Sequence, residues 1–375
     1  MKILKNITVF TMVMLLSVST VLEAREKNIS NFSSSASNLV DSTGTFDGNK
    51  IYADVANNGL FLDYHVSGDS ALEWPKGTGV HSIFQSALWM GATVNGSIRT
   101  IVGDYTQDMG PGPWGGDPLA AVHRIYKVEK SMLASPLDFA DFQEWPVEFG
   151  APWVDVDGDG VYTPLPGGTD HPEFLGDQVL WFVSNDGDPA YKLNFGTSPM
   201  NVEIQTTMFG FDRPDVFGDM VFLKQLVINK GSDDLVDTYM GLWSDPDLGY
   251  AGDDFVGCDV ALGMGYVWND GDDSQYSTLD IGTPAAGYDF FQGPMVPCED
   301  GDSEEVCPTE GAKMFGTRHP GMKNLKMSSF AFYINGDATY TDPSDETEGY
   351  FYLQGLRKDG SAYPVSYTHL RAHET

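Results

Sequence analysis

Basic residues and cysteines are scarce in this chain of 375 residues, which has 21 Lys and Arg against 54 Asp and Glu, and three Cys. The formal net charge of −33 repels nucleic acids and anionic lipid head groups, so we expect neither as a partner. The motifs HExxH, GxSxG and the P-loop are also absent from the sequence. Their absence argues against a zinc metalloprotease, a hydrolase with a nucleophile elbow and a P-loop nucleotidase.

One stretch matches a dinucleotide-binding pattern by letter only. Residues 110–115 fit GxGxxG, but Pro111, Pro113 and Pro118 prevent the helix that must follow such a loop. Paired carboxylates for glycoside hydrolysis stay open as an alternative, because a chain with 54 acidic residues brings some pair close together. A structural or binding role is therefore favoured over an enzymatic one.

Short segments rich in β-branched and aromatic residues recur along the chain and are bounded by Gly, Asp, Asn or Pro. They predict an all-β fold with an antiparallel β-sandwich-like architecture and long Asp/Gly-rich loops. Asn95-Gly96 between the apolar runs 87–94 and 97–105 predicts a hairpin. Residues 136–145 are the best candidate for one short helix. The other predicted strands are 50–56, 59–65, 121–129, 178–184, 201–211, 220–229, 236–243, 257–268, 328–335 and 349–357.

The first 24 residues have the pattern of a secretory signal peptide. Lys2 and Lys5 precede an apolar run, residues 7–22, that is too short for a comfortable membrane span. An uncleaved membrane anchor is the alternative interpretation. Cleavage after Ala24 would give a chain without a membrane span that is secreted or displayed at the cell surface. Residues 25–48 predict a flexible lead-in, and the β-rich region covers 49–364, with a subdivision near residue 150 left open.

The most specific site pattern lies in residues 151–162. Asp155, Asp157 and Asp159 stand at alternate positions, and glycines between them allow a tight turn. This spacing lets three carboxylates converge on one hard cation, with the carbonyl of Val161 as a fourth ligand. We therefore predict a structural Ca²⁺ site. A plain Asp-Gly turn without an ion is the alternative.

This loop resembles an EF-hand loop over its first seven positions only. The twelfth position is Pro166, so the bidentate Glu of an EF-hand is missing. The distal ligand must come from elsewhere, and Asp170 and Glu173 are the nearest candidates. The prediction is an Asp-rich calcium loop on a β scaffold.

A second acidic cluster lies between residues 244 and 259. Its carboxylates repel one another unless an ion or hydrogen bonds offset the repulsion, so a second hard-cation site is predicted with less specificity. Segments 269–273 and 299–305 are also acidic, but their pattern is a weaker indication of a metal site, and we interpret them as solvated turns. The five residues of the second cluster are Asp245, Asp247, Asp253, Asp254 and Asp259.

The three cysteines suggest one disulfide. Cys298 and Cys307 flank the acidic segment 299–306, and an exported protein can keep a bond between them. Cys258 is predicted to be a buried small residue on a strand. The last eleven residues, 365–375, are basic after an acidic chain and resemble a translated library adapter. We expect them to be a non-native tail on a truncated chain.

Several motifs together resemble a family of large secreted proteins from bacteria that use type IX secretion. The resemblance covers about residues 50–364 in order. It implies export across the outer membrane and surface attachment through a C-terminal sorting domain, which this sequence lacks, and it implies no particular activity. The motifs are WPKGTGVHSIF (74–84), ALWMG (87–91), GPGP (110–113), PWVDVDGDGVY (152–162), GLWSDPDLG (241–249), DDFVGCD (253–259) and NLKMSSF (324–330).

These observations combine into one functional expectation. The chain is predicted to be a secreted or surface-displayed, calcium-stabilised β-rich protein with a structural or binding role, whose partner is a surface glycan or a protein. The alternative is a secreted hydrolase that acts on polysaccharide or peptide and uses the calcium loop as a scaffold.

Overall fold

The structure is a computed structural model that describes residues 15–17, 43–165, 170–314, 316–334, 337 and 339–363. Within these ranges most ordered elements are strands in antiparallel sheets, which confirms the predicted all-β class. The α-helices of the described part are α2 (Ala140–Gln143) and α3 (Glu346–Leu353). Most of the predicted signal peptide, the lead-in up to residue 42 and the predicted tail lie outside the described residues.

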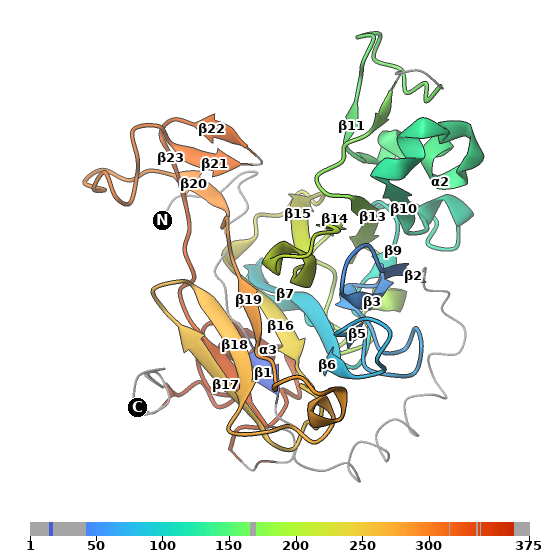
Figure 1. Cartoon of the computed structure of the whole chain (residues 1–375). Coiled ribbons are helices and arrows are strands. Elements are labelled where there is room, and N and C mark those ends of the chain that lie inside the picture. The colour runs from blue at the N-terminus through green and yellow to red at the C-terminus, as the bar shows by residue number, and fades with distance from the viewer. Residues whose placement is uncertain are drawn as a thin grey trace.

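Sheet I, the first main sheet, has the strand order β24-β1-β16-β7-β4, and β8 pairs with β7. The long strands β7 and β16 lie side by side in antiparallel register (Figure 1). The strands of sheet I are β1 (Leu15–Ser17), β4 (Leu60–Leu62), β7 (Gln85–Val94), β8 (Ser97–Ile101), β16 (Val236–Asp245) and β24 (Ala331–Tyr333).

Sheet II, the second main sheet, has the order β10-β13-β14-β15, and β9 pairs with β13. Strand β13 is buried at all eight positions, so it is covered on both faces. The strands of sheet II are β9 (Gly110–Pro111), β10 (Tyr126–Glu129), β13 (Gln178–Asn185), β14 (Val202–Gly210) and β15 (Phe222–Asn229).

Smaller sheets and single turns of 3-10 helix surround the two main sheets (Figure 1). One sheet joins β2 (Thr43–Phe46), β3 (Tyr52–Ala56), β5 (Leu72–Glu73) and β6 (His81–Ile83), and another joins β17 (Asp254–Asp259), β18 (Met264–Asn269) and β19 (Ala286–Asp289). The pairs are β11 (Trp153–Val154) with β12 (His171–Pro172), β20 (Met295–Pro297) with β23 (Met322–Asn324), and β21 (Ala312–Met314) with β22 (Thr317–His319). The 3-10 turns are η1 (Ala121–His123), η2 (Lys130–Ala134), η3 (Pro136–Asp138), η4 (Val147–Phe149), η5 (Pro189–Tyr191), η6 (Val216–Asp219) and η7 (Tyr276–Leu279).

Sheets I and II pack face to face, as the predicted sandwich requires. Each strand sends alternate side chains to this interface, because successive residues of a strand point to opposite faces. The buried cluster between the sheets contains Leu88, Met90 and Met240 from sheet I, and Val202, Ile204 and Val227 from sheet II.

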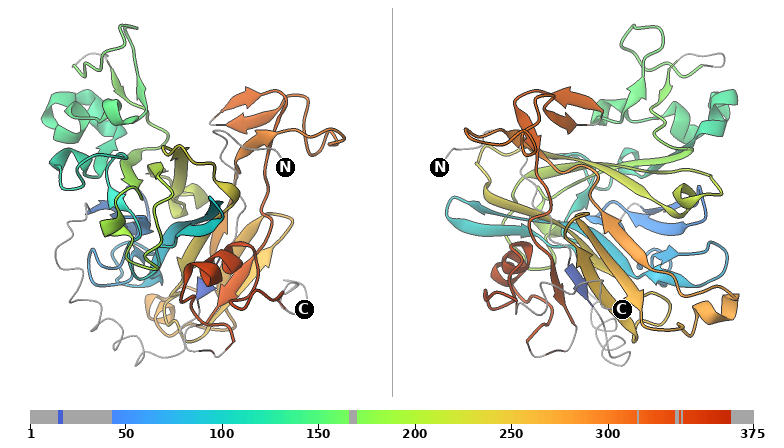
Figure 2. Two further views of the ribbon diagram at one scale, coloured as in Figure 1. Left: turned by 180° about the vertical axis from the view of Figure 1, so that it is seen from behind. Right: turned by 60° about the vertical axis from the view of Figure 1, so that its left-hand side comes forward.

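The opposite face of sheet I is covered by aromatic residues and by α3. The rings of Trp89 and Trp243 stack with centroids 5.7 Å apart, and Trp243 Nε1 donates a hydrogen bond of 2.6 Å to the hydroxyl of Tyr333. Helix α3 lies against this face of β7 and β8 (Figure 2), and it approaches β7 closely at Gly91. A Cβ on Gly91 would lie 2.7 Å from the ring of Tyr350, so this contact needs glycine.

Several strand predictions are confirmed. The hairpin forms between β7 and β8, and its turn residues Asn95 and Gly96 have φ of 51° and 82°. Two predictions need modest correction. Strand β2 begins at Thr43, inside the predicted lead-in, because Phe46 is fully buried in the core. The predicted helix 136–145 is a 3-10 turn followed by the four residues of α2.

Two other strand predictions are wrong. Segment 257–268 is a hairpin of β17 and β18 rather than one strand. The side chain of Asp259 accepts hydrogen bonds from the backbone N–H groups of Ala261 and Leu262, and these bonds stabilise the turn. Segment 349–357 belongs partly to helix α3. The side chain of Asp345 caps this helix by accepting hydrogen bonds from the N–H groups of its first turn, which the aromatic composition of the segment did not indicate.

The close packing of α3 on sheet I gives a stability prediction. We expect Gly91→Ala to lower the free energy of unfolding by about 1–3 kcal/mol, because the new methyl group overlaps Tyr350 and Leu353. Urea unfolding followed by tryptophan fluorescence measures the change. The control is Gly282→Ala, since Gly282 is exposed and nothing lies within 4 Å of an added Cβ. Equal unfolding midpoints for both variants would contradict the packing of α3.

Candidate functional site

The predicted calcium loop follows β11, and its residues 155–165 protrude from the body of the protein (Figures 1 and 2). Asp155, Asp157, Asp159 and Asp170 each place a carboxylate oxygen so that all four oxygens lie within 4.8 Å of one another. The first three side chains are exposed, whereas Asp170 is buried. Of the two distal ligands predicted from the sequence, Asp170 therefore joins the group.

Glu173, the other distal candidate, does not join it. Its carboxylate lies 3.6 Å from Lys224 Nζ, on the side of sheet II. Val161 was predicted to contribute its carbonyl, and its N–H donates to Asp159 Oδ1 at 2.7 Å. Its backbone therefore belongs to the same hydrogen-bonded turn, and ligation by its carbonyl stays a prediction.

Backbone hydrogen bonds give the loop its shape. Asp155 accepts from the N–H groups of Gly158 at 2.7 Å and Gly160 at 2.9 Å. Both glycines have positive φ, 78° and 76°, which side chains with a Cβ rarely adopt. Asp170 accepts from the N–H groups of Val156 at 2.9 Å and Thr163 at 2.8 Å, so it ties both arms of the loop together.

Tyr162 anchors the loop to the body of the protein. Its hydroxyl donates a hydrogen bond of 2.6 Å to the carbonyl of Phe142 in α2, and its ring meets Trp153 edge to face, with centroids 5.6 Å apart. A smaller aliphatic residue usually fills this position of an EF-hand loop, and here the larger ring packs against the cluster that covers sheet II. Ordering of the loop by an ion can therefore affect the packing of this core cluster through Tyr162.

The electrostatics of the loop favour a cation. A backbone hydrogen bond from Asp159 lowers the pKa of Asp157, but desolvation and the charges of Asp159, Asp170 and Asp155 outweigh it, so this pKa is raised. The pKa of Asp170 is lowered, chiefly by the backbone N–H of Thr163. Closely spaced, ionised carboxylates with remaining lone pairs are ligands that Ca²⁺ accepts.

The second predicted cluster does not converge in the same way. Within the described residues, the loop group is the one set of three or more His, Cys, Asp or Glu side chains with this spacing. Asp245 accepts a hydrogen bond of 2.9 Å from the hydroxyl of Tyr105, and Asp259 holds the β17–β18 turn. Asp253 accepts from Asn269 Nδ2 at 2.6 Å, and Asp247 faces Ser70 Oγ at 3.5 Å. The structure thus does not support one metal site formed by all five residues.

Asp254 is the most perturbed carboxyl of that cluster. Burial raises its pKa to about 8, the hydrogen bond from the N–H of Leu248 opposes this, and the charges of Asp247, Asp253 and Asp273 add to the increase. Its Oδ1 atom is buried without a hydrogen-bond partner. The folded state is therefore most stable when the carboxyl group of Asp254 is protonated.

The predicted disulfide is present, and Cys258 lies on a strand as predicted but is half-buried rather than buried. Cys298 and Cys307 form a disulfide with their Cα atoms 5.9 Å apart, which closes the acidic segment between them. Cys258 is free and half-buried on β17, and burial raises the pKa of its thiol to about 11. A thiol with this pKa is not a nucleophile near neutral pH.

The sequence did not reveal a large apolar cavity of about 1540 Å³ between the two main sheets. One wall is β15 with its flanks, residues 219–229, and another is segment 284–295. The cavity side of sheet I contributes Leu88, Met90 and Met240. The sequence contained one signal, because the predicted strand 220–229 has apolar residues on both of its faces. The structure places this strand, β15, at the edge of sheet II.

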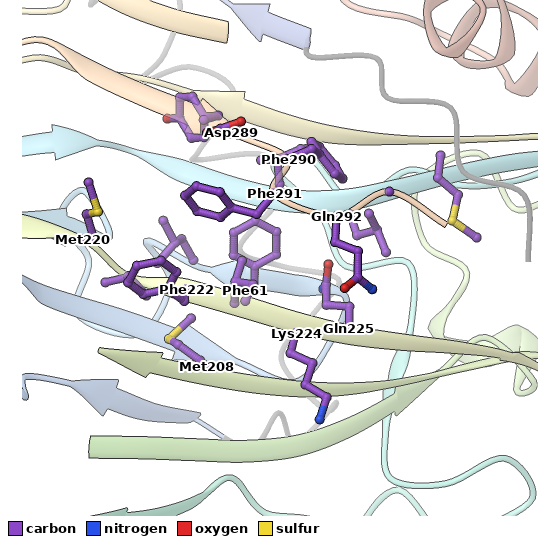
Figure 3. A pocket seen from close by; sticks show the side chains of 18 of the residues that line it. Phe61, Met208, Met220, Phe222, Lys224, Gln225, Asp289, Phe290, Phe291 and Gln292 are labelled. Atoms are coloured by element: carbon purple, nitrogen blue, oxygen red, sulfur yellow. The ribbon is translucent and has the colours of Figure 1, made fainter. Parts of the chain in front are cut away.

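Aromatic side chains gather on one side of this cavity (Figure 3). Phe222 and Phe291 stack with ring centroids 5.9 Å apart, and Phe61 and Phe290 lie beside them. Gln225 and Gln292, from opposite walls, lie close to each other at another side, where they add polar groups to an otherwise apolar lining. This composition fits an apolar ligand with a small polar part.

Comparison with known proteins found no match to this chain among family models, curated proteins or solved structures. Among the helices of the described part, none has the length and apolar character needed to cross a membrane. The resemblance to exported proteins of type IX secretion stays a prediction.

The raised pKa of Asp254 gives a pH-dependent prediction. A carboxyl whose pKa is higher in the folded state than in the unfolded state stabilises the fold below about pH 4, and this contribution is lost as the pH rises to about 8. We therefore expect Asp254→Asn to raise the melting midpoint by at least about 2 °C at pH 8.5 and to have little effect at pH 4.5.

Thermal melts of both proteins across this pH range measure the difference. Asp259→Asn is the matched control, because Asn can keep the side-chain oxygen that accepts from Ala261. A shift for Asp254→Asn that does not change with pH would contradict the raised pKa of Asp254.

Proposed function

We propose that this chain is an exported, calcium-stabilised β-rich binding protein that acts in solution outside the cell or at the cell surface. The observation that carries the calcium part is the convergence of Asp155, Asp157, Asp159 and Asp170. The export part depends on the predicted signal peptide and on the resemblance to type IX secreted proteins. The binding part is supported by the apolar cavity between the sheets.

Calcium would act on the loop through charge and coordination. Ca²⁺ takes six to eight oxygen ligands, and the four carboxylates, the Val161 carbonyl and water can provide them. Without the bidentate Glu of an EF-hand, the affinity belongs to the weak extracellular class, roughly 10⁻⁴ to 10⁻³ M. Binding would offset the repulsion between Asp157 and its neighbours and fix the loop on which Tyr162 is anchored.

The cavity lining favours binding over hydrolysis. Its described lining residues include no histidine, and its acidic residues are Glu173, Asp219 and Asp289. Glu173 faces Lys224, and Asp219 accepts hydrogen bonds from Lys50 at 2.7 Å and from Trp74 Nε1 at 2.9 Å. Two of the three carboxylates are therefore engaged in structural contacts, and we do not propose the hydrolase alternative.

A calcium-dependent melt tests the proposed site. With calcium about 100-fold above the dissociation constant, binding adds about 2.7 kcal/mol, which corresponds to a rise of roughly 5 °C in the melting midpoint. We expect a chelator to remove this rise in the natural protein, and we expect Asp157→Ala to abolish the response to calcium. Differential scanning calorimetry measures the midpoints, and titration calorimetry with Ca²⁺ measures binding directly.

Asp212→Ala is the control for loss of one exposed negative charge that does not belong to the loop group. This variant should keep the full response to calcium. Identical melts of the natural protein with calcium and with chelator would contradict the calcium proposal and would leave the loop as a hydrogen-bonded Asp-Gly turn.

A further inference from the structure

Lys192 and Asp108 form an ion pair that is enclosed within the protein. Lys192 Nζ lies 2.9 Å from Asp108 Oδ2, and the two side chains are only 1% and 2% exposed. In each of the other ion pairs of the described part, at least one of the two side chains keeps contact with solvent. The contact between Lys192 and Asp108 is therefore the one that water does not screen.

Backbone groups at the end of β8 hold both members of this pair in place. Asp108 belongs to the loop between β8 and β9, and its Oδ2 atom accepts a hydrogen bond of 2.9 Å from the N–H of Val102. Lys192 follows the 3-10 turn η5, and its Nζ atom also donates to the carbonyl of Thr100 at 2.5 Å. Asn194 Nδ2 donates to the carbonyl of Val102 at 2.6 Å, so the residues after η5 stay against β8. The ammonium and the carboxylate are thus held together by more than their own attraction.

The carboxylate of Asp108 is unfavourably placed as an ion. Its Oδ1 atom is buried, and within the described residues it has no hydrogen-bond partner. A buried acceptor without a partner costs free energy, and burial of the ion pair adds the desolvation of both charges. Burial raises the pKa of Asp108, and the charge of Lys192 opposes this only in part. Transfer of a proton from the ammonium to the carboxylate, which leaves two neutral groups, is therefore easier here than at the protein surface.

A neutral amine and a neutral carboxyl group in contact can condense to an amide. We propose that Lys192 and Asp108 become joined by an isopeptide bond, which the protein forms by itself during folding. Lys192 Nζ attacks Cγ of Asp108, and the new C–N bond replaces the bond between Cγ and Oδ1. Oδ1 leaves as water with the two protons that the ammonium loses, and Oδ2 stays as the carbonyl oxygen of the amide. Atoms and charges balance without a further reactant.

The surrounding groups match the amide better than they match the ion pair. The amide carbonyl keeps Oδ2, so it accepts from the N–H of Val102, which already donates there. This N–H also stabilises the negative charge that develops on Oδ2 during the attack. The amide N–H donates to the carbonyl of Thr100, which already accepts from Lys192 Nζ. The buried oxygen without a partner, Asp108 Oδ1, is lost, so each polar atom of the product has a hydrogen-bond partner.

Confinement of the two groups favours condensation over hydrolysis. Well-oriented groups in one molecule react as though their concentration were about 10⁵–10⁸ M, which exceeds the concentration of bulk water. The bond links positions 84 residues apart, and like a disulfide it restricts the unfolded chain. Unlike the Cys298–Cys307 disulfide, it does not depend on oxidising conditions. The inference concerns the fold itself and holds whether or not the loop at residues 155–165 binds calcium.

Intact-mass spectrometry of the reduced and denatured protein tests the bond. We expect a mass about 18 Da below the value calculated from the sequence and the measured N-terminus, because the bond forms with loss of one water. Lys192→Met removes the amine, so this variant should have its full calculated mass. The matched control is Lys127→Met, since Lys127 pairs with Asp47 and both side chains are partly exposed. This control should keep the deficit of one water.

A natural protein with its full calculated mass would overturn the proposal and leave an ordinary buried ion pair. A deficit that persists in Lys192→Met would also overturn it, because dehydration of a pair such as Asp157-Gly158 removes one water as well.

A tryptic digest of the natural protein is the second measurement, because misfolding of Lys192→Met could also remove the deficit. Trypsin should not cut after Lys192, and the peptides that contain Lys192 and Asp108 should stay joined after reduction. A free peptide that ends at Lys192 as the main product would contradict the bond.

Discussion

Hydrogen bonds from backbone N–H groups to aspartate side chains hold the long loops of this protein on its two main sheets. Asp170 ties the two arms of the β11–β12 loop, and Asp186 accepts from the N–H groups of Met200 and Val202 at 2.7 Å each. Asp273 accepts from Tyr250, Gln275 and Tyr276, and it is fully buried. A carboxylate can accept several such bonds at once, so a fold with many irregular loops can use many Asp residues. The acidic composition is therefore in part a structural requirement.

The same device has opposite consequences in the two acidic clusters. In the β11–β12 loop, three carboxylates stay exposed and keep oxygen lone pairs that point towards one another, so a cation can lower their repulsion. Around Asp254 the side chains of Asp245, Asp247 and Asp254 are buried, and the hydrogen bonds of the cluster involve different partners. Burial, with a smaller contribution from neighbouring charges, raises the pKa of Asp254 there, and proton uptake is the available response. Exposure and direction of the lone pairs, rather than the number of acidic residues, separate an ion site from a protonated carboxyl.

The sequence predicted local features well and long-range ones poorly. The Asn95-Gly96 hairpin, the Cys298–Cys307 disulfide and the three alternating Asp residues all depend on neighbours within about ten positions, and the structure contains each of them. Helix α3 was missed because its cap, Asp345, lies before the aromatic segment that resembled a strand. Convergence of the second cluster could not be judged from spacing, because burial and hydrogen-bond direction depend on tertiary contacts. The cavity was not predicted either, since its walls come from segments far apart in the chain.

The apolar cavity follows from the way in which the two main sheets end. Strand β15 ends sheet II, and segment 284–295 lines the cavity beside it without pairing to it, so the sandwich is left open along one side of its core. Open apolar edges normally lead proteins to associate with their own copies. A net charge of −33 opposes such association through long-range repulsion between like molecules, while an uncharged apolar ligand is not repelled. The strong acidity therefore complements an incomplete core, because it allows an open apolar cavity to persist without self-association.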